Sequence, residues 1–334
     1  MMTKTTSRCC YVLTACLLQA TLVAARPASA QAPQATPPQT PPQGAPAQAG
    51  PADPAADLLK QGQQEMRAGK PEAALPLYRK AAETFPTSSP AHNQLGVALD
   101  LTGQYADARK SFAKAIETAA TPQAKAQATR SMAMSYAFEN NCKEAAKYES
   151  PLYDQYLEAK DFFSAGEIAN ELARVCLEAG DLDTAAKWYQ SGHDAGLREP
   201  DIKPDRKDLW EFRWEHAQAR LAARRGDKAG AQTHADAAKI ILDKGTNPSQ
   251  APFFPYLTGY VAFYAGDYKN ALTELQKGNQ NDPFILALIA QAYEKIGDDA
   301  QAKTYYRKIL TFTAHNPTNA FARPLAKKKL GGGS

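Results

Sequence analysis

Apolar residues recur at the three- and four-residue spacing of amphipathic helices along most of this chain, and short polar breaks interrupt them at regular intervals. The stretch AGKPEAALPLYRKAAETFP, residues 68–86, opens with a Gly-Lys-Pro break, continues through spaced alanines to a tyrosine and closes on a proline. Thirty-four residues later, TGQYADARKSFAKAIETAA places a glycine, two alanines and an aromatic in the same columns. This pattern predicts a repeated unit of two helices joined by a short turn.

The unit recurs seven times, and we anchor each copy at its turn residue: Gly69, Gly103, Asn140, Gly180, Gly226, Gly266 and Gly297. Seven positions before the anchor, every residue is Gly or Ala: Gly62, Gly96, Ala133, Ala173, Ala219, Gly259 and Ala290. Five positions after it, every residue is Ala: Ala74, Ala108, Ala145, Ala185, Ala231, Ala271 and Ala302. Nine positions after it, aromatic residues prevail: Tyr78, Phe112, Glu149, Tyr189, Ala235, Leu275 and Tyr306.

Each column has a physical reason. Two antiparallel helices need small residues where they cross, because a large side chain would push their axes apart. A glycine at the turn can adopt the left-handed conformation that ends the first helix. We expect the aromatic to pack over the next helix pair, which buries a face that one pair cannot cover alone.

These columns resemble the tetratricopeptide repeat, a 34-residue helix-turn-helix unit. The resemblance implies an all-α fold, an α-solenoid (right-handed superhelix) of about seven repeats with a C-terminal capping helix. The solenoid is expected over 57–317, with repeats at about 55–88, 89–122, 126–159, 166–199, 212–245, 252–285 and 283–316. A capping helix is expected over 318–330 and a flexible tail over 331–334.

The middle of the array departs from the pattern. Glu149 and Ala235 stand where an aromatic is expected, and Pro151 is predicted to interrupt a second helix. The segment REPDIKPDRKD, residues 198–208, is predicted to be a polar loop between the fourth and fifth helix pairs.

Residues 1–30 have the features of an export signal. Lys4 and Arg8 precede an apolar stretch, and Ala28-Ser29-Ala30 is a small-residue cleavage pattern that predicts a mature chain starting at Gln31. The predicted location is the periplasm of a bacterium. The alternatives are secretion, a retained membrane anchor, and lipid attachment through Cys16, which ends a short lipobox-like sequence. Residues 31–56 hold eight prolines and one charge, which predicts a disordered linker.

Charge excludes one class of partner. The 334 residues carry a net charge of +4, and three basic residues lie in the first thirty, where there is no acidic residue. The rest of the chain, with 36 basic and 35 acidic residues, is almost neutral. No basic face remains that would indicate nucleic acid as the partner. After signal removal we expect no stable membrane insertion, and the sequence leaves the oligomeric state open.

The chain offers little catalytic chemistry. None of its five histidines lies in a zinc-binding spacing, and there is no phosphate-binding loop or nucleophile elbow. His216 and His234 fall in one predicted hairpin, where a weak metal site is conceivable, although a surface or groove role fits better. We predict a protein that is not an enzyme and has neither a cofactor nor a metal.

The first helix of each pair is expected to line a concave groove where a partner binds. Helical phase selects twelve lining residues, of which Met134 and Leu177 are two. The other ten are the candidate groove residues: Arg130, Phe138, Asn170, Arg174, His216, Arg220, Arg224, Tyr256, Tyr260 and Phe263. Arginine and aromatic residues dominate interface energetics, which favours a protein or peptide partner and a role as scaffold or adaptor in the cell envelope. A different interpretation of the same residues is solvated arginines and rings that belong to the core.

Two further interpretations of the groove remain open. The protein could be an accessory subunit of an envelope enzyme, or a solenoid that binds carbohydrate or a small ligand through Tyr256, Tyr260 and Tyr264. Some members of the tetratricopeptide repeat family bind a carboxy-terminal dicarboxylate of a partner through Lys and Asn side chains in adjacent repeats. The corresponding places in the first repeats here hold Leu59, Gln63, Asn93 and Val97, which do not form that clamp.

Two cysteines, Cys142 and Cys176, follow the predicted cleavage site. One is expected at the start of a second helix and the other near the end of the next first helix, so both lie at the same edge of the stack. An even pair in an exported protein points to a disulfide. The alternative is a buried Cys176 and a free surface thiol at Cys142.

Overall fold

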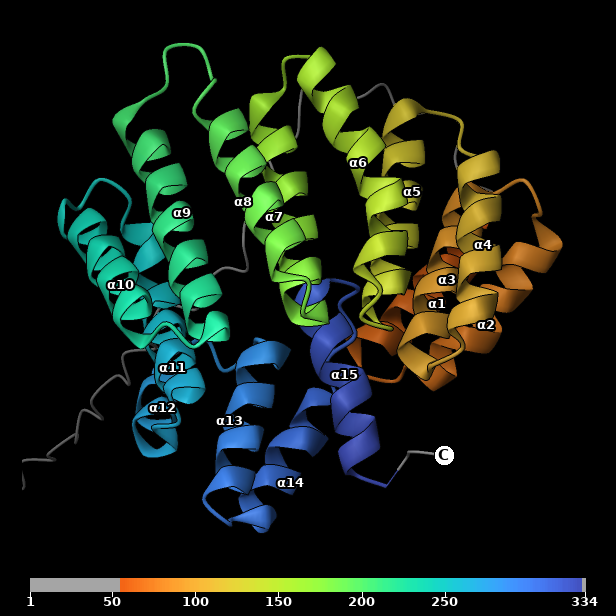
Figure 1. The fold of residues 1–334 in the computed structure, drawn as a ribbon. Helices are drawn as coiled ribbons and strands as arrows, with labels where there is room; N and C mark the ends of the chain where they lie inside the picture. Colours follow the sequence, from red (N-terminus) through yellow and green to blue (C-terminus); the bar gives the residue numbers. More distant parts are fainter. Residues whose placement is uncertain (1–54, 332–334) are drawn as a thin grey trace, which may run out of the picture. The chain divides into compact units, whose positions relative to one another are not determined.

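The computed structural model of the chain describes residues 55–331, all within the compact unit Pro38–Ser334, and those residues are dominated by helices (Figure 1). The export signal with its Ala30–Gln31 cleavage site, Cys16, most of the proline-rich segment and residues 332–334 lie outside the described residues. No strand occurs in the part that is described. The fold is an all-α solenoid.

Fourteen of the helices in residues 55–331 form seven antiparallel pairs, each packed against the next. The pairs are α1 (Ala56–Arg67) with α2 (Pro71–Thr84), α3 (Ser89–Thr102) with α4 (Tyr105–Glu117), α5 (Pro122–Ala137) with α6 (Cys142–Glu158), α7 (Phe162–Ala179) with α8 (Leu182–Gly196), α9 (Pro204–Arg225) with α10 (Lys228–Asp243), α11 (Phe254–Ala265) with α12 (Tyr268–Leu275), and α13 (Pro283–Lys295) with α14 (Asp299–Ile309). A short 3₁₀ helix, η1 (Pro248–Phe253), precedes α11, and α15 (Pro317–Lys329) follows α14.

The anchor residues end the first helices in the left-handed conformation, as predicted. All seven have positive φ, from 54° at Asn140 to 90° at Gly103 and Gly180. In five pairs the next residue is Asp or Asn, and its side chain accepts a hydrogen bond from the backbone N–H three residues later: Asn141, Asp181, Asp227, Asp267 and Asp298. Each turn therefore stops one helix and caps the start of the next within two residues.

The small-residue columns lie where the helices cross. All seven alanines of the second column are at most 1% exposed. A Cβ at Gly96 would lie 2.5 Å from Cε1 of Phe112, and one at Gly62 would lie 2.3 Å from Cε1 of Tyr78. In these pairs the aromatic ring lies against the small residue of its own pair. The ring thus fills the space that the missing side chain leaves, and whether it also packs over the next pair stays a prediction.

Two local expectations are wrong. The predicted loop 198–208 is partly helical, because α9 already begins at Pro204. A proline at the first helical position needs no hydrogen-bond partner for its nitrogen, and Asp205 favours the positive helix start. Likewise α6 runs through Pro151 without a break. Pro151 is exposed, so water can satisfy the backbone carbonyl that its ring leaves without a donor.

The C-terminal segment packs back onto the early part of the solenoid. Helix α15 contacts α13 and α14, and also α5 and α7. Before it, Thr313 donates a hydrogen bond of 2.9 Å to the carbonyl oxygen of Met66 at the end of α1. His315 lies 2.8 Å from a carboxylate oxygen of the buried Asp100 in α3. The capping helix thus covers more than the last pair.

Candidate functional site

Half of the ten predicted groove residues are inside the protein. Five are at most 8% exposed: Phe138, His216, Arg220, Tyr256 and Tyr260. The expectation that these five line an open groove is wrong, because the C-terminal elements and neighbouring rings cover them. Phe138, for example, stacks on His315 of the returning C-terminal segment with ring centroids 5.5 Å apart.

The other five predicted residues are half-buried and do not share one surface. Asn170 faces its own partner helix, since a Cβ at Gly192 in α8 would lie 3.0 Å from its Oδ1. Phe263 packs edge-on against Tyr264 and Tyr268. Arg174 and Arg224 lie beside the buried Arg220, whereas Arg130 lies apart from them and pairs with Glu171.

Three arginines from two first helices converge within the solenoid. We call this group the inner arginine cluster: Arg174 of α7, Arg220 and Arg224 of α9, and the carboxylate of Glu178 in α7. Arg224 lies 3.2 Å from Glu178, and their side chains are 16% and 9% exposed. Arg220 is 6% exposed, and its Nε donates to the backbone oxygen of His216 at 3.3 Å.

Aromatic rings enclose the inner arginine cluster. The guanidinium of Arg174 lies 5.0 Å from the ring centre of Phe284 in α13 and 5.9 Å from that of Phe321 in α15. Arg220 lies 5.4 Å from the ring centre of Tyr189, and Arg224 lies 5.2 Å from that of Tyr264. Such contacts attract a cation to the electron-rich face of a ring. The alternative interpretation is therefore right about the rings, which belong to the core. It is wrong about the arginines, which are buried or half-buried among those rings and not solvated.

Several polar atoms in this assembly have no protein partner among the described residues. They are Arg174 Nε, Glu178 Oε1, Tyr189 Oη, His216 Nε2 and Tyr256 Oη. Buried polar groups are nearly always hydrogen-bonded, since an unpaired one costs about 1–3 kcal/mol. Several polar atoms without a protein partner in one assembly are therefore unusual for a protein interior.

Burial keeps the neutral members of the assembly uncharged. Burial raises the pKa of Tyr189, of Tyr256 and of Tyr260. The pKa of His216 is held well below its usual range, first by burial and then by the charges of Arg220 and Arg174. Positive charge therefore resides on the arginines alone.

A second group of arginines, which the sequence analysis missed except for Arg130, remains in contact with water. We call it the exposed arginine band: Arg130 of α5 with Arg206 and Arg213 of α9. Their side chains are 43%, 32% and 29% exposed. Arg130 pairs with Glu171 and Arg213 with Glu167, so both reach across to α7. Arg206 lies 3.9 Å from the ring centre of Phe163, also in α7.

Helix length explains why two of these residues were missed. In a 34-residue unit the inner face of the first helix begins about ten positions before the anchor. Helix α9 has 22 residues, so its inner face continues about three turns further, and Arg213 and Arg206 lie 13 and 20 positions before Gly226. Extending the helical phase by those turns would have found them.

Glu149 is the other unusual buried charge. It takes the aromatic position of the third pair, is 0% exposed, and has neither carboxylate oxygen paired among the described residues. Burial and the nearby Glu171 raise its pKa well above the usual range, and Arg130 opposes them. Burial inside the protein therefore shifts Glu149 toward its protonated form relative to water.

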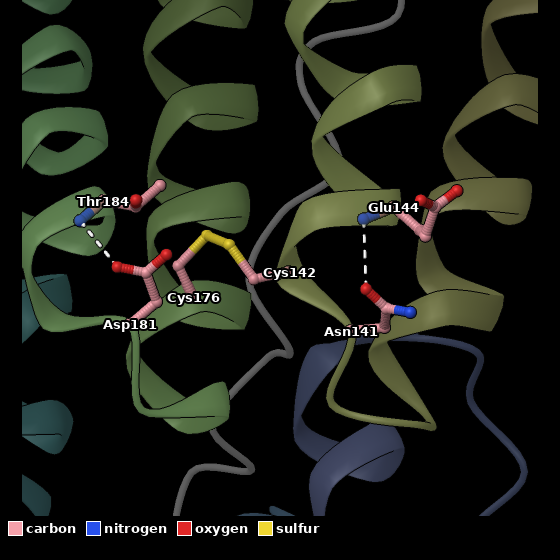
Figure 2. The surroundings of a disulfide bond; sticks show 6 residues. All are labelled: Asn141, Cys142, Glu144, Cys176, Asp181 and Thr184. Atoms are coloured by element: carbon pink, nitrogen blue, oxygen red, sulfur yellow. Dashed lines mark hydrogen bonds between the residues drawn. A yellow bond between two sulfur atoms is a disulfide. The ribbon is translucent and has the colours of Figure 1, made fainter.

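Cys142 and Cys176 are joined by a disulfide between the start of α6 and the last turn but one of α7 (Figure 2). Their Cα atoms are 4.7 Å apart, and they are separated by 34 positions in the sequence. Figure 2 also shows the capping residues Asn141 and Asp181 at the starts of α6 and α8 beside the bond. The bond links the third pair, which contains Glu149, to the fourth.

The histidines do not form a metal site in the described residues. His234 pairs with Glu215 at 2.6 Å, whereas His216 turns inward to Tyr256 with ring centroids 5.4 Å apart. Nowhere in residues 55–331 do three His, Cys, Asp or Glu side chains meet as metal ligands would. Within the same residues, every helix is too short or too polar to cross a bilayer.

Comparison with known proteins agrees with the helix pairs. A family model described as tetratricopeptide repeat matches residues 59–125, and a second one with that description matches residues 285–316. These ranges contain the first two helix pairs, apart from the start of α1, and most of the last pair. No curated protein matches the chain.

Three solved structures are similar to this chain, and RapI, with a TM-score above 0.5, shares its fold. The apo form of RapI is 11% identical with a TM-score of 0.52, and the match covers 84% of this chain and 99% of that one. A tetratricopeptide repeat protein from Parabacteroides merdae is 12% identical with a TM-score of 0.46 and coverages of 83% and 97%. In the APC/C hetero-tetramer Cut9-Hcn1, the matched chain is 16% identical with a TM-score of 0.40; the match covers 82% of this chain but only 48% of that one.

Left-handed turns, buried alanines at the crossings and two family matches all describe the same unit. This chain contains tetratricopeptide repeats at residues 59–125 and 285–316.

Proposed function

We propose that this protein is a non-catalytic scaffold of the bacterial cell envelope that binds a protein or peptide partner through the exposed arginine band. Tetratricopeptide repeats generally serve protein interaction. Export is inferred from residues 1–30, and a disulfide between Cys142 and Cys176 suits an oxidising compartment.

The observation that carries the proposal is the exposed arginine band itself. Arg130, Arg206 and Arg213 lie on first helices, reach across to α7, and are about one third exposed or more. Each guanidinium has five N–H donors, more than one carboxylate takes up, so an acidic side chain of a partner can bind beside the present carboxylate. The half-buried ring of Phe163 supplies an apolar contact beside Arg206. The band therefore suits a segment that carries acidic and apolar side chains.

The carbohydrate interpretation loses its basis. It relied on Tyr256, Tyr260 and Tyr264 as stacking platforms, but Tyr256 is 5% exposed and Tyr260 is 0% exposed. A buried ring cannot stack on a sugar, and Tyr264 alone of the three is partly exposed.

The test is capture of a partner from envelope extract by the full mature chain, with and without Arg206→Ala and Arg213→Ala together. We expect the wild type to retain a specific protein, identified by mass spectrometry, and the double variant to lose most of it. Arg225→Ala is the matched control, because Arg225 is 45% exposed and pairs with Asp183 away from the band. Equal capture by wild type and double variant would refute the role of the band.

A further inference from the structure

A cavity of about 460 Å³ lies between the first turns of α9 and the end of α10. Its lining residues come from the loop before α9, from one face of α9 and from the end of α10: Ile202, Pro204, Lys207, Asp208, Glu211, Ile241 and Lys244. The four residues of α9 are spaced by three and four positions, which places them on the same side of the helix. A volume of this size is typical of small-molecule sites in proteins.

One pair of opposite charges in this cavity is already satisfied. Asp208 is 7% exposed, and its carboxylate accepts hydrogen bonds from Nζ of Lys244 at 2.7 Å and from Oγ1 of Thr246 at 2.5 Å. These bonds hold the segment after α10 against α9, and they balance the charge of Asp208 with that of Lys244. The two residues therefore shape the cavity and leave the other charges in it to a ligand.

The second pair of charges is not engaged in this way. Nζ of Lys207 makes no hydrogen bond or ion pair to any residue in the range 55–331. Glu211 has a contact of 3.4 Å from Oε2 to Nε2 of His193, whereas its Oε1 has no partner in that range. Lys207 and Glu211 are four positions apart on one helix face, where opposite charges can meet, yet they do not pair. Each therefore presents an unused charge to the same cavity.

Apolar side chains form the opposite wall and remain in contact with water. Ile202 and Ile241 are half-buried, and both line the cavity. Ile240 is 67% exposed, the highest value of any large apolar side chain in the part of the chain that is described. It lies one turn before Lys244 on the same side of the helix, at the rim of the cavity. An aliphatic group placed here would remove apolar surface from water, which is favourable.

We propose that this cavity binds a small aliphatic zwitterion, a free amino acid or a dipeptide. The carboxylate of the ligand pairs with Lys207, its ammonium group donates to Oε1 of Glu211, and its aliphatic side chain packs against Ile202 and Ile241. The cavity contains two positive and two negative side chains, so a ligand with one charge of each sign leaves no surplus. Because Lys207 and Lys244 are exposed, the ligand can enter from solvent.

This site goes beyond the proposed scaffold function and is independent of it. None of its lining residues belongs to the exposed arginine band, so partner capture and zwitterion binding can fail separately. A neighbouring cavity of about 400 Å³ shares Ile202 with it and is lined by Lys203 and Arg206. Lys203 lines only that neighbouring cavity, which makes it a matched control for Lys207.

The probe is L-leucine, measured with the full mature chain by isothermal titration calorimetry and thermal unfolding. N-acetyl-L-leucine lacks the ammonium group, and L-leucinamide lacks the carboxylate. We expect saturable binding of L-leucine, a melting temperature that rises with its concentration, and about tenfold weaker binding of both derivatives. Equal binding of L-leucine and the two derivatives would overturn the proposal, because the paired charges would then play no part.

Variants assign the binding to this cavity. Lys207→Met and Glu211→Gln each remove one charge from a side chain in contact with water, so we expect folding to be kept and L-leucine affinity to fall about tenfold. Lys203→Met is expected to leave the affinity unchanged. An unchanged affinity in Lys207→Met, or an equal fall in Lys203→Met, would refute the site.

A dipeptide distinguishes the two sources of the zwitterion. L-alanyl-L-leucine carries the same end groups as L-leucine, but one further residue separates them. Tighter binding of L-leucine supports the site and assigns it to free amino acids. Tighter binding of the dipeptide, with the same loss in Lys207→Met, also supports the site and assigns it to short peptides. If neither compound binds at concentrations up to about 10 mM, the proposal is wrong.

Discussion

Arg323 donates a hydrogen bond from Nε to the backbone oxygen of Leu101 at 2.7 Å, across 222 positions of sequence. Lys327, one turn later in α15, donates to the same oxygen at 3.0 Å. Leu101 lies in the last turn of α3, where carbonyl groups have no partner within the helix and carry partial negative charge. The last helix of the chain therefore caps the second pair of the solenoid.

Loss of Arg323 should weaken this closure. Besides Leu101, its guanidinium bonds to the backbone oxygens of Leu310 and Phe312, and the residue is 3% exposed. We expect Arg323→Met to destabilise the protein by about 2–4 kcal/mol, because three carbonyl groups lose a charged donor. Urea unfolding measures this. Lys328→Met, on the exposed side of the same helix, is the control, and an equal loss in both variants would contradict the role of Arg323.

Gly96→Ala should be destabilising even though alanine favours helices. The added Cβ would lie 2.5 Å from Phe112, and overpacking costs about 1–3 kcal/mol. The cost should shrink in a Phe112→Ala background, which reproduces the natural combination of Ala219 with Ala235. A double-mutant cycle of melting temperatures measures the coupling. Additive effects would show that the two residues do not meet.

The disulfide should contribute substantially to stability. Closing a loop of 34 positions removes unfolded-state entropy worth about 4 kcal/mol in the chain-entropy model. Replacing Cys142 and Cys176 together by serine should lower the urea midpoint of the oxidised protein to near that of the reduced wild type. Thiol counting on denatured, unreduced protein from the periplasm should find no free thiol in the mature chain. Two free thiols would mean that the bond does not form in the cell.

Glu149→Gln should stabilise the protein more at high pH than at low pH. Folding raises the pKa of Glu149 above its unfolded value of about 4.3. The folded state therefore binds the proton more tightly, and wild-type stability falls as pH rises from about 4.3 through the folded pKa. Glutamine stays neutral and can donate to Glu171. Melting temperatures of both proteins at pH 5 and pH 8 test this, and a pH-independent difference would contradict it.

Export should yield a mature chain that begins at Gln31 and carries no lipid. The reason is the small-residue pattern Ala28-Ser29-Ala30 after the apolar stretch. Intact mass of the protein recovered from the periplasm gives the answer. A lipid-modified chain starting at Cys16 would contradict the cleavage site and place the protein on a membrane.

The repeat unit could be predicted from the sequence because it depends on local geometry. A left-handed turn needs glycine or asparagine, as at Gly180 and Asn140, and a close helix crossing needs alanine or glycine, as at Ala185 and Gly96. These requirements recur at a fixed spacing, so they remain visible without a structure. The edge position of Cys142 and Cys176 follows from the same local rules.

The candidate sites depended on contacts between residues far apart in the chain. Helical phase placed Arg220 and Tyr256 on the inner face, but it could not show that α13 and α15 close over that face. The C-terminal segment is held against α3 by the hydrogen bonds of Arg323 to Leu101 and of His315 to Asp100. These are contacts of single residues, and they leave no periodic pattern in the sequence. Periodicity thus determined the helix pairs, whereas burial of the arginines was decided by how the last helices pack against the first ones.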